Sequence, residues 1–454
     1  MKSTFFERNN VRRAVVFSGG GAKGAFEIGV WKALNALGYY ADIVTGTSIG
    51  ALNGALYLSG KQEEAEKLWK ELEIKDVLNF KPPENKGSIM YYGKTISEFM
   101  MYTIKEKGLS STSLREIISK YIVDESNMRD KGIIFGLSVF NFKNMETENI
   151  YLDDIHHGTL IDYLLASSAL FPIMEKHYIN DIPYIDGGFG NNIPIDMALD
   201  KNPDQMVIVD IKGPGVYKRD DRIKNCEHIW VSTNWPLGDM LLFNQKRTEL
   251  NIQLGYLEMM KRAMPKKYLG CWYTFHTENY QQENDLFFIA LNQVLTGEKT
   301  SQLYKQLDSK SYQKKLIIEL SKKWKKSVDE KTVMLAIIEE SGKTFNVSPD
   351  KQYEIKEFQN IILERMKQWV ESEKNQTAES IYSLNIMNGQ DWQREFFEQL
   401  PLISNRRIAI HIFKWLNEGV LTYEEPLFYM FLKVKPYSLM IALYCNYLLS
   451  KESG

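Results

Sequence analysis

The chain has 454 residues, of which 44% are hydrophobic and 25% are charged, values typical of a soluble globular protein with room for a large core and two domains. Its formal net charge of −2 gives no electrostatic reason to expect binding to nucleic acid. The three cysteines, Cys226, Cys271 and Cys445, are widely separated, so the sequence indicates neither a disulfide framework nor a cysteine metal site and is typical of a reducing compartment.

The N-terminal segment, residues 1–13, is polar and charged, and the apolar run 14–17 after it is too short for the core of a signal peptide. No stretch approaches the roughly 20 apolar residues that a membrane-spanning helix needs. The best candidate, residues 437–449, is short. We therefore expect a cytoplasmic protein and leave peripheral contact with a membrane open.

Residues 14–17 are apolar throughout and predict a buried strand. They lead into Ser18-Gly19-Gly20-Gly21-Ala22-Lys23-Gly24, after which a helical pattern continues to Gly38. Three consecutive glycines let the backbone turn several N–H groups toward one point, which favours an anion-binding loop.

The same loop also fits a dinucleotide-binding pattern, Gly19-x-Gly21-x-x-Gly24. That hypothesis needs an acidic residue about 20 positions further on, at the end of the second strand. Asp42 lies roughly there, but it begins the strand instead of ending it. A nucleotide-binding enzyme is therefore the less favoured interpretation, and no Gly-Lys-Ser/Thr sequence makes this loop a P-loop.

The next short apolar run leads into Gly46-Thr47-Ser48-Ile49-Gly50, and residues 51–58 have the pattern of a helix. A strand, a sharp turn and a helix around Gly-x-Ser-x-Gly are the features of a nucleophile elbow. The strained turn requires little bulk two positions from the serine, which Gly46 and Gly50 satisfy. An ordinary helix N-cap in a turn is the alternative.

Strands and helices alternate through the middle of the chain, which predicts an α/β fold with a largely parallel sheet and a site at the carboxyl ends of its strands. Asp186-Gly187-Gly188 follows a short apolar run, although Asp-Gly is also common in simple turns. The predicted helices are 63–72, 96–104, 114–121, 160–169 and 240–263, the predicted strands are 132–142, 149–152, 206–211, 228–232 and 268–275, and 80–92 is a predicted loop.

Strand patterns fade after about residue 283, and the remaining predicted helices are 301–328, 332–340, 351–373, 391–399, 405–418 and 436–449. The predicted organisation is therefore a catalytic domain at 12–280 and a helical region of unknown role at 281–454.

Taken in order, these motifs resemble those of the patatin-like phospholipases over roughly residues 12–275. Gly19 to Gly24 is similar to the glycine-rich oxyanion loop of that family, Gly46 to Gly50 to its nucleophile elbow, and Asp186-Gly187-Gly188 to its base motif. Residues 166–172 resemble a segment that the family carries between elbow and base. Two departures are Ser18, where the family often has Asp, and Lys23 in place of a frequent Arg.

The resemblance implies a three-layer patatin-like fold and a Ser48–Asp186 dyad without histidine. It also implies an oxyanion hole formed by Gly19, Gly20, Gly21 and Ala22, a lipid or phospholipid ester as substrate, and no metal or cofactor. Chemically, a serine hydroxyl needs a base to become a nucleophile, and backbone donors stabilise the oxyanion that forms when it attacks an ester.

Two alternatives stay open at this point. His228 and His276 follow Asp186 in the sequence, as the histidine of an ordinary α/β-hydrolase follows its acid. Either histidine could therefore be the base in place of Asp186. The second alternative is a regulatory or binding protein in which the dyad is gated or idle. For membrane contact, we expect either the lysine-rich helix 312–328, with Leu316, Leu320 and Trp324 on one side, or a lid at 82–92.

Overall fold

The computed structural model describes residues 3–73, 103, 109–121, 124–278, 280–296, 309–374, 403–422 and 426–452. The predicted loop 80–92, with its candidate lid, and the predicted helix 391–399 lie outside these residues, as does the predicted helix 96–104 apart from Thr103. The chain forms two compact units, Met1–Pro265 and Lys266–Gly454.

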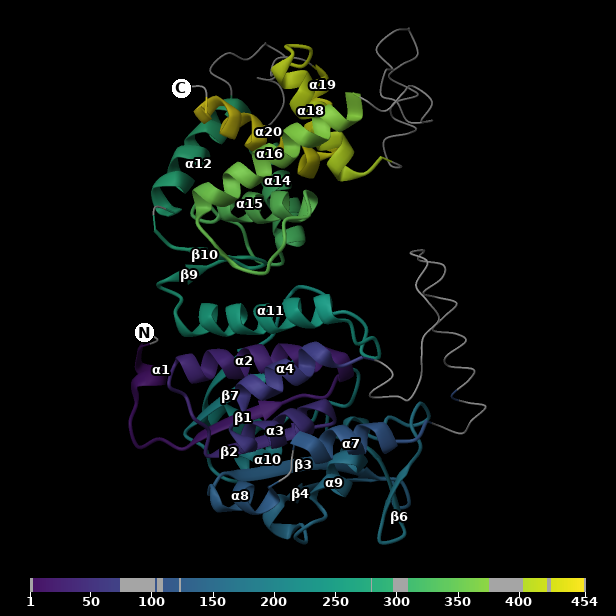
Figure 1. The fold of residues 1–454 in the computed structure, drawn as a ribbon. Helices are drawn as coiled ribbons and strands as arrows, with labels where there is room; N and C mark the ends of the chain where they lie inside the picture. Colours follow the sequence, from purple (N-terminus) through teal and green to yellow (C-terminus); the bar gives the residue numbers. More distant parts are fainter. Residues whose placement is uncertain are drawn as a thin grey trace. The chain divides into compact units, whose positions relative to one another are not determined.

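The first unit is built on an eight-stranded sheet (Figure 1). Five strands are parallel, in the spatial order β3 (Ile134–Asn141), β2 (Ile43–Thr47), β1 (Arg13–Phe17), β7 (Gln205–Val209) and β8 (Glu227–Val231). Three more strands form antiparallel pairs: β4 (Glu146–Tyr151) and β6 (Ile182–Asp186) pair with β3, and β5 (His177–Ile179) pairs with β6. The predicted α/β class with a largely parallel sheet is confirmed.

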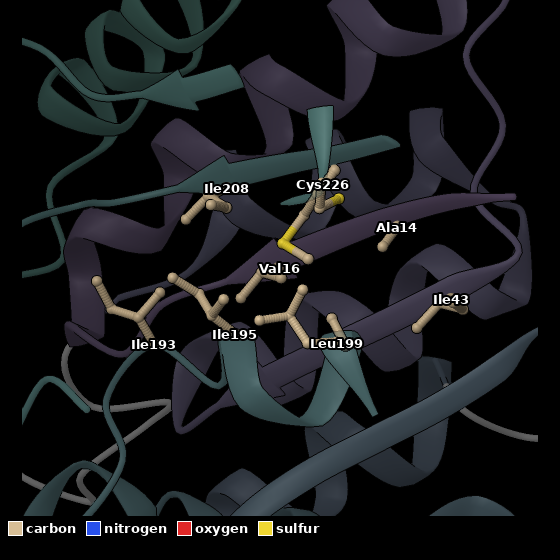
Figure 2. Packing of buried hydrophobic residues seen from close by; sticks show 10 residues of the cluster. Ala14, Val16, Ile43, Ile193, Ile195, Leu199, Ile208 and Cys226 are labelled. Atoms are coloured by element: carbon tan, nitrogen blue, oxygen red, sulfur yellow. The ribbon is translucent and has the colours of Figure 1, made fainter. Parts of the chain in front are cut away.

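Helices cover both faces of this sheet, because the parallel strands are apolar on both sides. On one face, Val16 and Ile208 pack with Ile195 and Leu199 of α10 (Ile195–Leu199), as Figure 2 shows. On the other face lie α2 (Ala25–Ala36) and α3 (Ile49–Ser59). Their remaining helical neighbours in this unit are α1 (Ser3–Glu7), α4 (Gln62–Glu71), α7 (Thr112–Tyr121), α8 (Glu125–Asp130), α9 (Leu160–Ser167) and α11 (Gln245–Ala263), with short 3₁₀ turns at Gly21–Gly24, Leu152–Asp154, Gly187–Phe189 and Asp221–Asn225.

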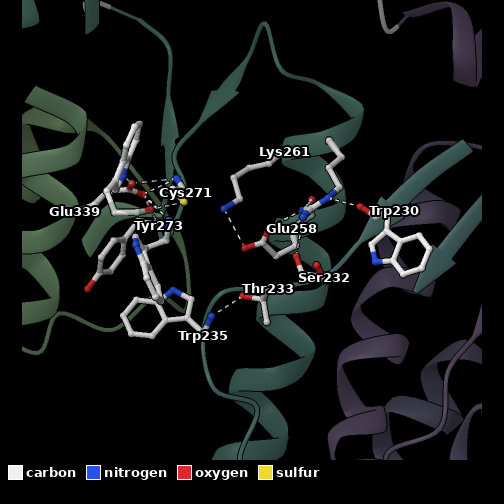
Figure 3. Close-up of polar contacts among 12 residues, drawn as sticks. Trp230, Ser232, Thr233, Trp235, Glu258, Lys261, Cys271, Tyr273 and Glu339 are labelled. Atoms are coloured by element: carbon white, nitrogen blue, oxygen red, sulfur yellow. Dashed lines mark hydrogen bonds and ion pairs between the residues drawn. The ribbon is translucent and has the colours of Figure 1, made fainter. Parts of the chain in front are cut away.

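Arg262 fixes the end of α11 to the sheet. Its guanidinium donates to the carbonyl oxygens of Trp230 (2.7 Å) and Ser232 (2.7 Å) at the end of β8, while Glu258 pairs with it at 2.6 Å (Figure 3). Although Glu258 is buried, its pKa is lowered, because Lys261 and Arg262 outweigh the effect of burial.

The second unit is mainly helical, as predicted. Its helices are α12 (Tyr280–Thr296), α14 (Ser309–Trp324), α15 (Val333–Thr344), α16 (Ile355–Lys374), α18 (Asn405–Asn417), α19 (Pro426–Val434) and α20 (Pro436–Glu452). Helix α20 is buried along most of its length, which explains the apolar composition of residues 437–449. None of the helices within the described residues is long and apolar enough to cross a membrane.

The predicted strand 268–275 is not a single strand. It contains two short strands, β9 (Tyr268–Leu269) and β10 (Thr274–His276), which form a separate sheet with β11 (Gln352–Tyr353) in the second unit. Between them the chain turns to Glu339, a buried carboxylate that accepts from the N–H groups of Cys271 (2.9 Å) and Tyr273 (2.7 Å) (Figure 3). The two compact units thus divide before β9, whereas the proposed domain boundary at 280/281 remains a prediction.

The proposed membrane-facing helix also needs correction. Leu316, Leu320 and Trp324, which were expected to meet a membrane, are all buried within the second unit. An apolar side that is already packed inside the protein is not available to lipid, so this helix does not have the exposed amphipathic surface that was predicted.

Candidate active site

Ser48 occupies a sharp turn between β2, which ends at Thr47, and α3, which begins at Ile49. Its backbone has φ 55° and ψ −126°, a conformation that a residue with a side chain rarely adopts. The turn is closed so tightly that a Cβ on Gly46 would lie 2.3 Å from the carbonyl oxygen of Gly50, and one on Gly50 would lie 2.5 Å from that of Phe17. Both glycines are therefore required by the space around Ser48.

The hydroxyl of Ser48 donates a hydrogen bond to Oδ2 of Asp186 at 2.6 Å. The other carboxylate oxygen, Oδ1, accepts from the N–H of Gly188 at 2.7 Å. Asp186 is buried, and burial raises the pKa of its carboxyl to about 6, while the hydrogen bonds from Ser48 and Gly188 act in the opposite direction. A carboxylate with this pKa is ionised at neutral pH and is a stronger base than an exposed aspartate.

The sequence did not indicate the strand direction that brings Asp186 next to Ser48. Strand β6 runs antiparallel to β3, so its carboxyl end points in the opposite direction to those of the parallel strands. The register compensates: Asp186 pairs with Val139, one residue beyond Ser138, and Ser138 pairs with Thr47. The carboxyl end of β6, at Asp186, therefore lies next to the turn that contains Ser48.

Within the described part of the first unit, His228 makes no hydrogen bond with Ser48. His228 lies near the start of β8, where its Nδ1 is 2.9 Å from the carbonyl oxygen of Cys226. His276 is in β10 of the second unit, 3.7 Å from Glu354. The side chain within hydrogen-bond distance of the Ser48 hydroxyl is Asp186.

The glycine-rich loop lies between β1 and α2, and its N–H groups are not equivalent. Those of Gly19 and Ala22 already donate to the carbonyl oxygens of Asn192 (3.0 Å) and Met240 (2.7 Å). Within the described residues, the N–H groups of Gly20 and Gly21 have no hydrogen-bond partner. Of the four expected oxyanion donors, Gly19 and Ala22 are thus occupied in this structure, which leaves Gly20 and Gly21.

Two other residues of the loop motif have structural partners. The ammonium group of Lys23 donates to the carbonyl oxygen of Lys212 at 3.0 Å, and the carbonyl oxygen of Gly24 accepts from Asn53 at 3.1 Å. Asp42, the acidic residue of the nucleotide hypothesis, accepts from the N–H of Arg13 at the start of β1. Because β1 and β2 are parallel, Asp42 lies at the edge of the sheet opposite the glycine loop, which argues against the nucleotide hypothesis.

Asn192 was not singled out from the sequence. Its carbonyl accepts from Gly19, its side-chain amide donates back to the carbonyl of Gly19 at 3.3 Å, and its N–H donates to Val216 at 2.7 Å. The side chain is buried among Gly19, Gly188 and Gly215, so any Cβ on these glycines would collide with it. Asn192 thus joins the glycine loop to the segment after Asp186, and its only sequence signal was its position six residues after that aspartate.

An apolar cavity of about 100 Å³ opens beside Ser48 and Asp186. Ser48, Asp186 and Gly21 line it, and its walls come from α3, α4, α7 and two connecting segments. The main apolar side chains are Leu52, Leu56, Leu68, Trp69, Leu114, Ile118, Leu170, Ile173, Met174, Leu241 and Phe243. Such a lining suits an aliphatic chain placed next to a nucleophile.

No group of three or more His, Cys, Asp or Glu side chains in the described part of the chain is arranged to hold a metal ion.

Comparison with known proteins identifies the class to which this arrangement belongs. The family model "Patatin-like phospholipase" matches residues 15–199, which include the glycine loop, the elbow and Asp186. Residues 15–199 are therefore a patatin-like phospholipase domain, and the family resemblance seen in the sequence is confirmed for this part of the chain.

Among individual proteins, the chain is similar to patatin-like phospholipase domain-containing protein 7 of Mus musculus, with 27% identity over 205 residues, and to domain-containing protein 6 of Homo sapiens, with 26% over 212 residues. Each match covers 44% of this chain but only 13% of the relative's length. A comparison of structures gives VipD from Legionella pneumophila, with a TM-score of 0.36 and 13% identity, covering 98% of this chain and 93% of that one.

Proposed function

We propose that the protein hydrolyses carboxylic esters of lipids, with Ser48 as nucleophile and Asp186 as general base. The observation that carries this proposal is the 2.6 Å hydrogen bond from the Ser48 hydroxyl to the buried Asp186 carboxylate, beside an apolar cavity. This distance is within the range of about 2.6–3.2 Å at which a base can take the proton of a nucleophile.

In the proposed reaction, Asp186 takes the hydroxyl proton as Oγ of Ser48 attacks the ester carbonyl. The oxyanion that forms is stabilised by the N–H groups of Gly20 and Gly21, aided by the N-terminal end of α3. The ester's C–O bond then breaks, and the leaving alcohol takes the proton from Asp186. Water, deprotonated by the same carboxylate, then attacks the acyl-serine. The bond between Oγ of Ser48 and the acyl group breaks, Oγ takes the proton back from Asp186, and the fatty acid and the free enzyme are released.

The apolar cavity supports an acyl chain as the part of the substrate that is bound. A lipid or phospholipid ester fits both this lining and the family of the domain, and we extend the proposal to action at a membrane surface by a cytoplasmic protein. An idle dyad is not favoured, because both Ser48 and Asp186 are present and in contact.

The test is hydrolysis of a short nitrophenyl ester and of a fluorogenic phospholipid in vesicles by the full chain and its variants. Ser48→Ala and Asp186→Ala are each expected to lower kcat by roughly a thousandfold or more, as in other serine hydrolases. Ser59→Ala, at the far end of α3, is the matched control and keeps wild-type rates. Substantial activity in Asp186→Ala would show that another group is the base, and activity in Ser48→Ala would reject the proposed nucleophile.

A further inference from the structure

The segment 166–172, which resembles the family but had no assigned role, contacts the backbone of both members of the dyad. The N–H of Ser48 donates to Oγ of Ser167 at 2.9 Å. Two residues later, the carbonyl oxygen of Ala169 accepts from the N–H of Asp186 at 2.9 Å. One short stretch at the end of α9 therefore holds the peptides of Ser48 and Asp186 at once.

The hydroxyl of Ser167 is fixed in direction. A serine hydroxyl has a single proton, and Ser167 uses it to donate to the carbonyl oxygen of Ser138 at 2.7 Å. Its oxygen is therefore the acceptor for the N–H of Ser48. The side chain is fully buried, so water does not substitute for either contact.

The Ser167 hydroxyl lies where the pairing between β2 and β3 ends, directly before the turn that contains Ser48. Strands β2 and β3 pair as far as Thr47 and Ser138. Ser48 leaves the strand with its positive φ, and the Ser167 hydroxyl lies between its N–H and the carbonyl of Ser138. A strained residue persists only where its surroundings hold it, and this hydrogen bond is such a restraint.

We propose that Ser167 is a positioning residue that holds the Ser48 peptide in its strained conformation and thereby aims Oγ at Asp186 and at the substrate carbonyl. This inference rests on the proposed function of the dyad. Ser167 does not line the cavity, so it acts through Ser48 and not on the substrate. Its loss is expected to reduce the rate of the chemical step and to leave substrate binding nearly unchanged.

The test compares wild type, Ser167→Ala and Ser167→Thr in the full chain with the nitrophenyl ester as substrate. We expect Ser167→Ala to lower kcat about 10- to 100-fold with KM within about twofold. The rate at which a fluorophosphonate labels Ser48 should fall by a similar factor, and Ser167→Thr, which keeps the hydroxyl, should recover much of both rates. Ser341→Ala removes another buried serine hydroxyl, in the second unit, and is the matched control.

Thermal melting separates a positioning role from general destabilisation. Wild-type kcat in folded Ser167→Ala, whatever its melting temperature, would overturn the proposal. If the variants fail to fold, amide hydrogen exchange in the wild-type chain decides: slow exchange of the Ser48 N–H supports the proposal, and exchange as fast as in an exposed loop overturns it. A failure of the proposed function is recognised separately, because Ser48→Ala would then retain the wild-type rate.

Discussion

The carboxyl group of Asp186 combines two properties that a base requires. It is close enough to Ser48 to take its proton, and burial has raised its pKa to about 6. A higher pKa makes the carboxylate a better proton acceptor, yet at pH 7 to 8 the group is still mostly ionised. The N–H of Gly188 keeps the ionised form from being left without a partner.

This pKa gives a prediction for the pH dependence of activity. Below about pH 6 Asp186 is protonated and cannot accept the proton of Ser48, so kcat/KM should rise with pH and reach half its maximum near pH 6. The profile should be measured with the nitrophenyl ester between pH 4.5 and 8.5, with a melting curve at each pH to exclude unfolding. A flat profile down to pH 4.5 would contradict the assignment of Asp186.

The contact between Ser48 and Asp186, the two proposed catalytic residues, could be predicted from the sequence, because each lies in a short motif of glycines around a reactive side chain. The residues that hold the backbone around Ser48 and Asp186 could not be predicted in this way. Ser167 and Asn192 act on residues more than 100 positions away, through contacts that depend on where β3 and the 186–194 segment lie in the sheet. Equally, no pattern shows that the N–H groups of Gly19 and Ala22 are already bonded.

Among the secondary-structure elements, β1, β2 and β7 follow directly from their apolar, β-branched sequences. The short antiparallel strands follow less directly. Strand β4, which is exposed or half-buried along its length, was predicted only in part, as residues 149–152, and β5 has only three residues. The direction of β6 was therefore missed, although it decides how Asp186 arrives beside Ser48.

The elbow between β2 and α3 yields a prediction about Gly50. A Cβ at this position would meet the backbone oxygens of Phe17 and Ser18 at 2.5 and 2.7 Å, and backbone atoms within a sheet cannot move away. Gly50→Ala should therefore destabilise the fold by about 3 kcal/mol or more and abolish hydrolysis.

Urea unfolding followed by circular dichroism measures the stability of Gly50→Ala. The matched control is Gly158→Ala, where the backbone has φ +87° but nothing lies within 4 Å of the added Cβ, so a loss of only about 1 kcal/mol is expected. Equal stability of Gly50→Ala and wild type would show that the turn is looser than the structure indicates.

For the chain as a whole, hydrophobic periodicity correctly predicted an α/β fold with a helical C-terminal region, and the domain boundary at 280/281 stays a prediction. Residues 268–275 have the composition of a strand, and one strand was predicted for them. Their backbone N–H groups instead donate hydrogen bonds to Glu339 of α15, which is distant in the sequence. Such a contact leaves no local sequence pattern.

Glu339 should accordingly be important for the stability of the second unit. It is fully buried and accepts from the N–H groups of Cys271, Trp272 and Tyr273 and from the indole of Trp324. Hydrogen bonds to a charged group contribute about 1.5–3 kcal/mol each, and removal of their acceptor leaves buried donors unpaired. Glu339→Ala should therefore lower the free energy of unfolding by at least about 3 kcal/mol.

Calorimetry of the full chain tests this prediction by the position of the melting transitions. Glu319→Gln is the control. Glu319 is on the surface of α14, and within the described residues its one ion pair is with Lys322. A change of less than about 0.5 kcal/mol is expected for it. Wild-type melting of Glu339→Ala would contradict the role given to this carboxylate.

The central claim, that Ser48 forms an acyl-enzyme with the help of Asp186, is tested most directly by rapid mixing of the protein with the nitrophenyl ester. If deacylation is the slower step, the release of nitrophenol begins with a burst of about one equivalent per chain. Mass spectrometry of the quenched protein should then find the acyl group on the peptide that contains Ser48, and Ser48→Ala should show neither burst nor adduct. Turnover with the acyl group on another residue, or unchanged turnover by Ser48→Ala, would contradict the account.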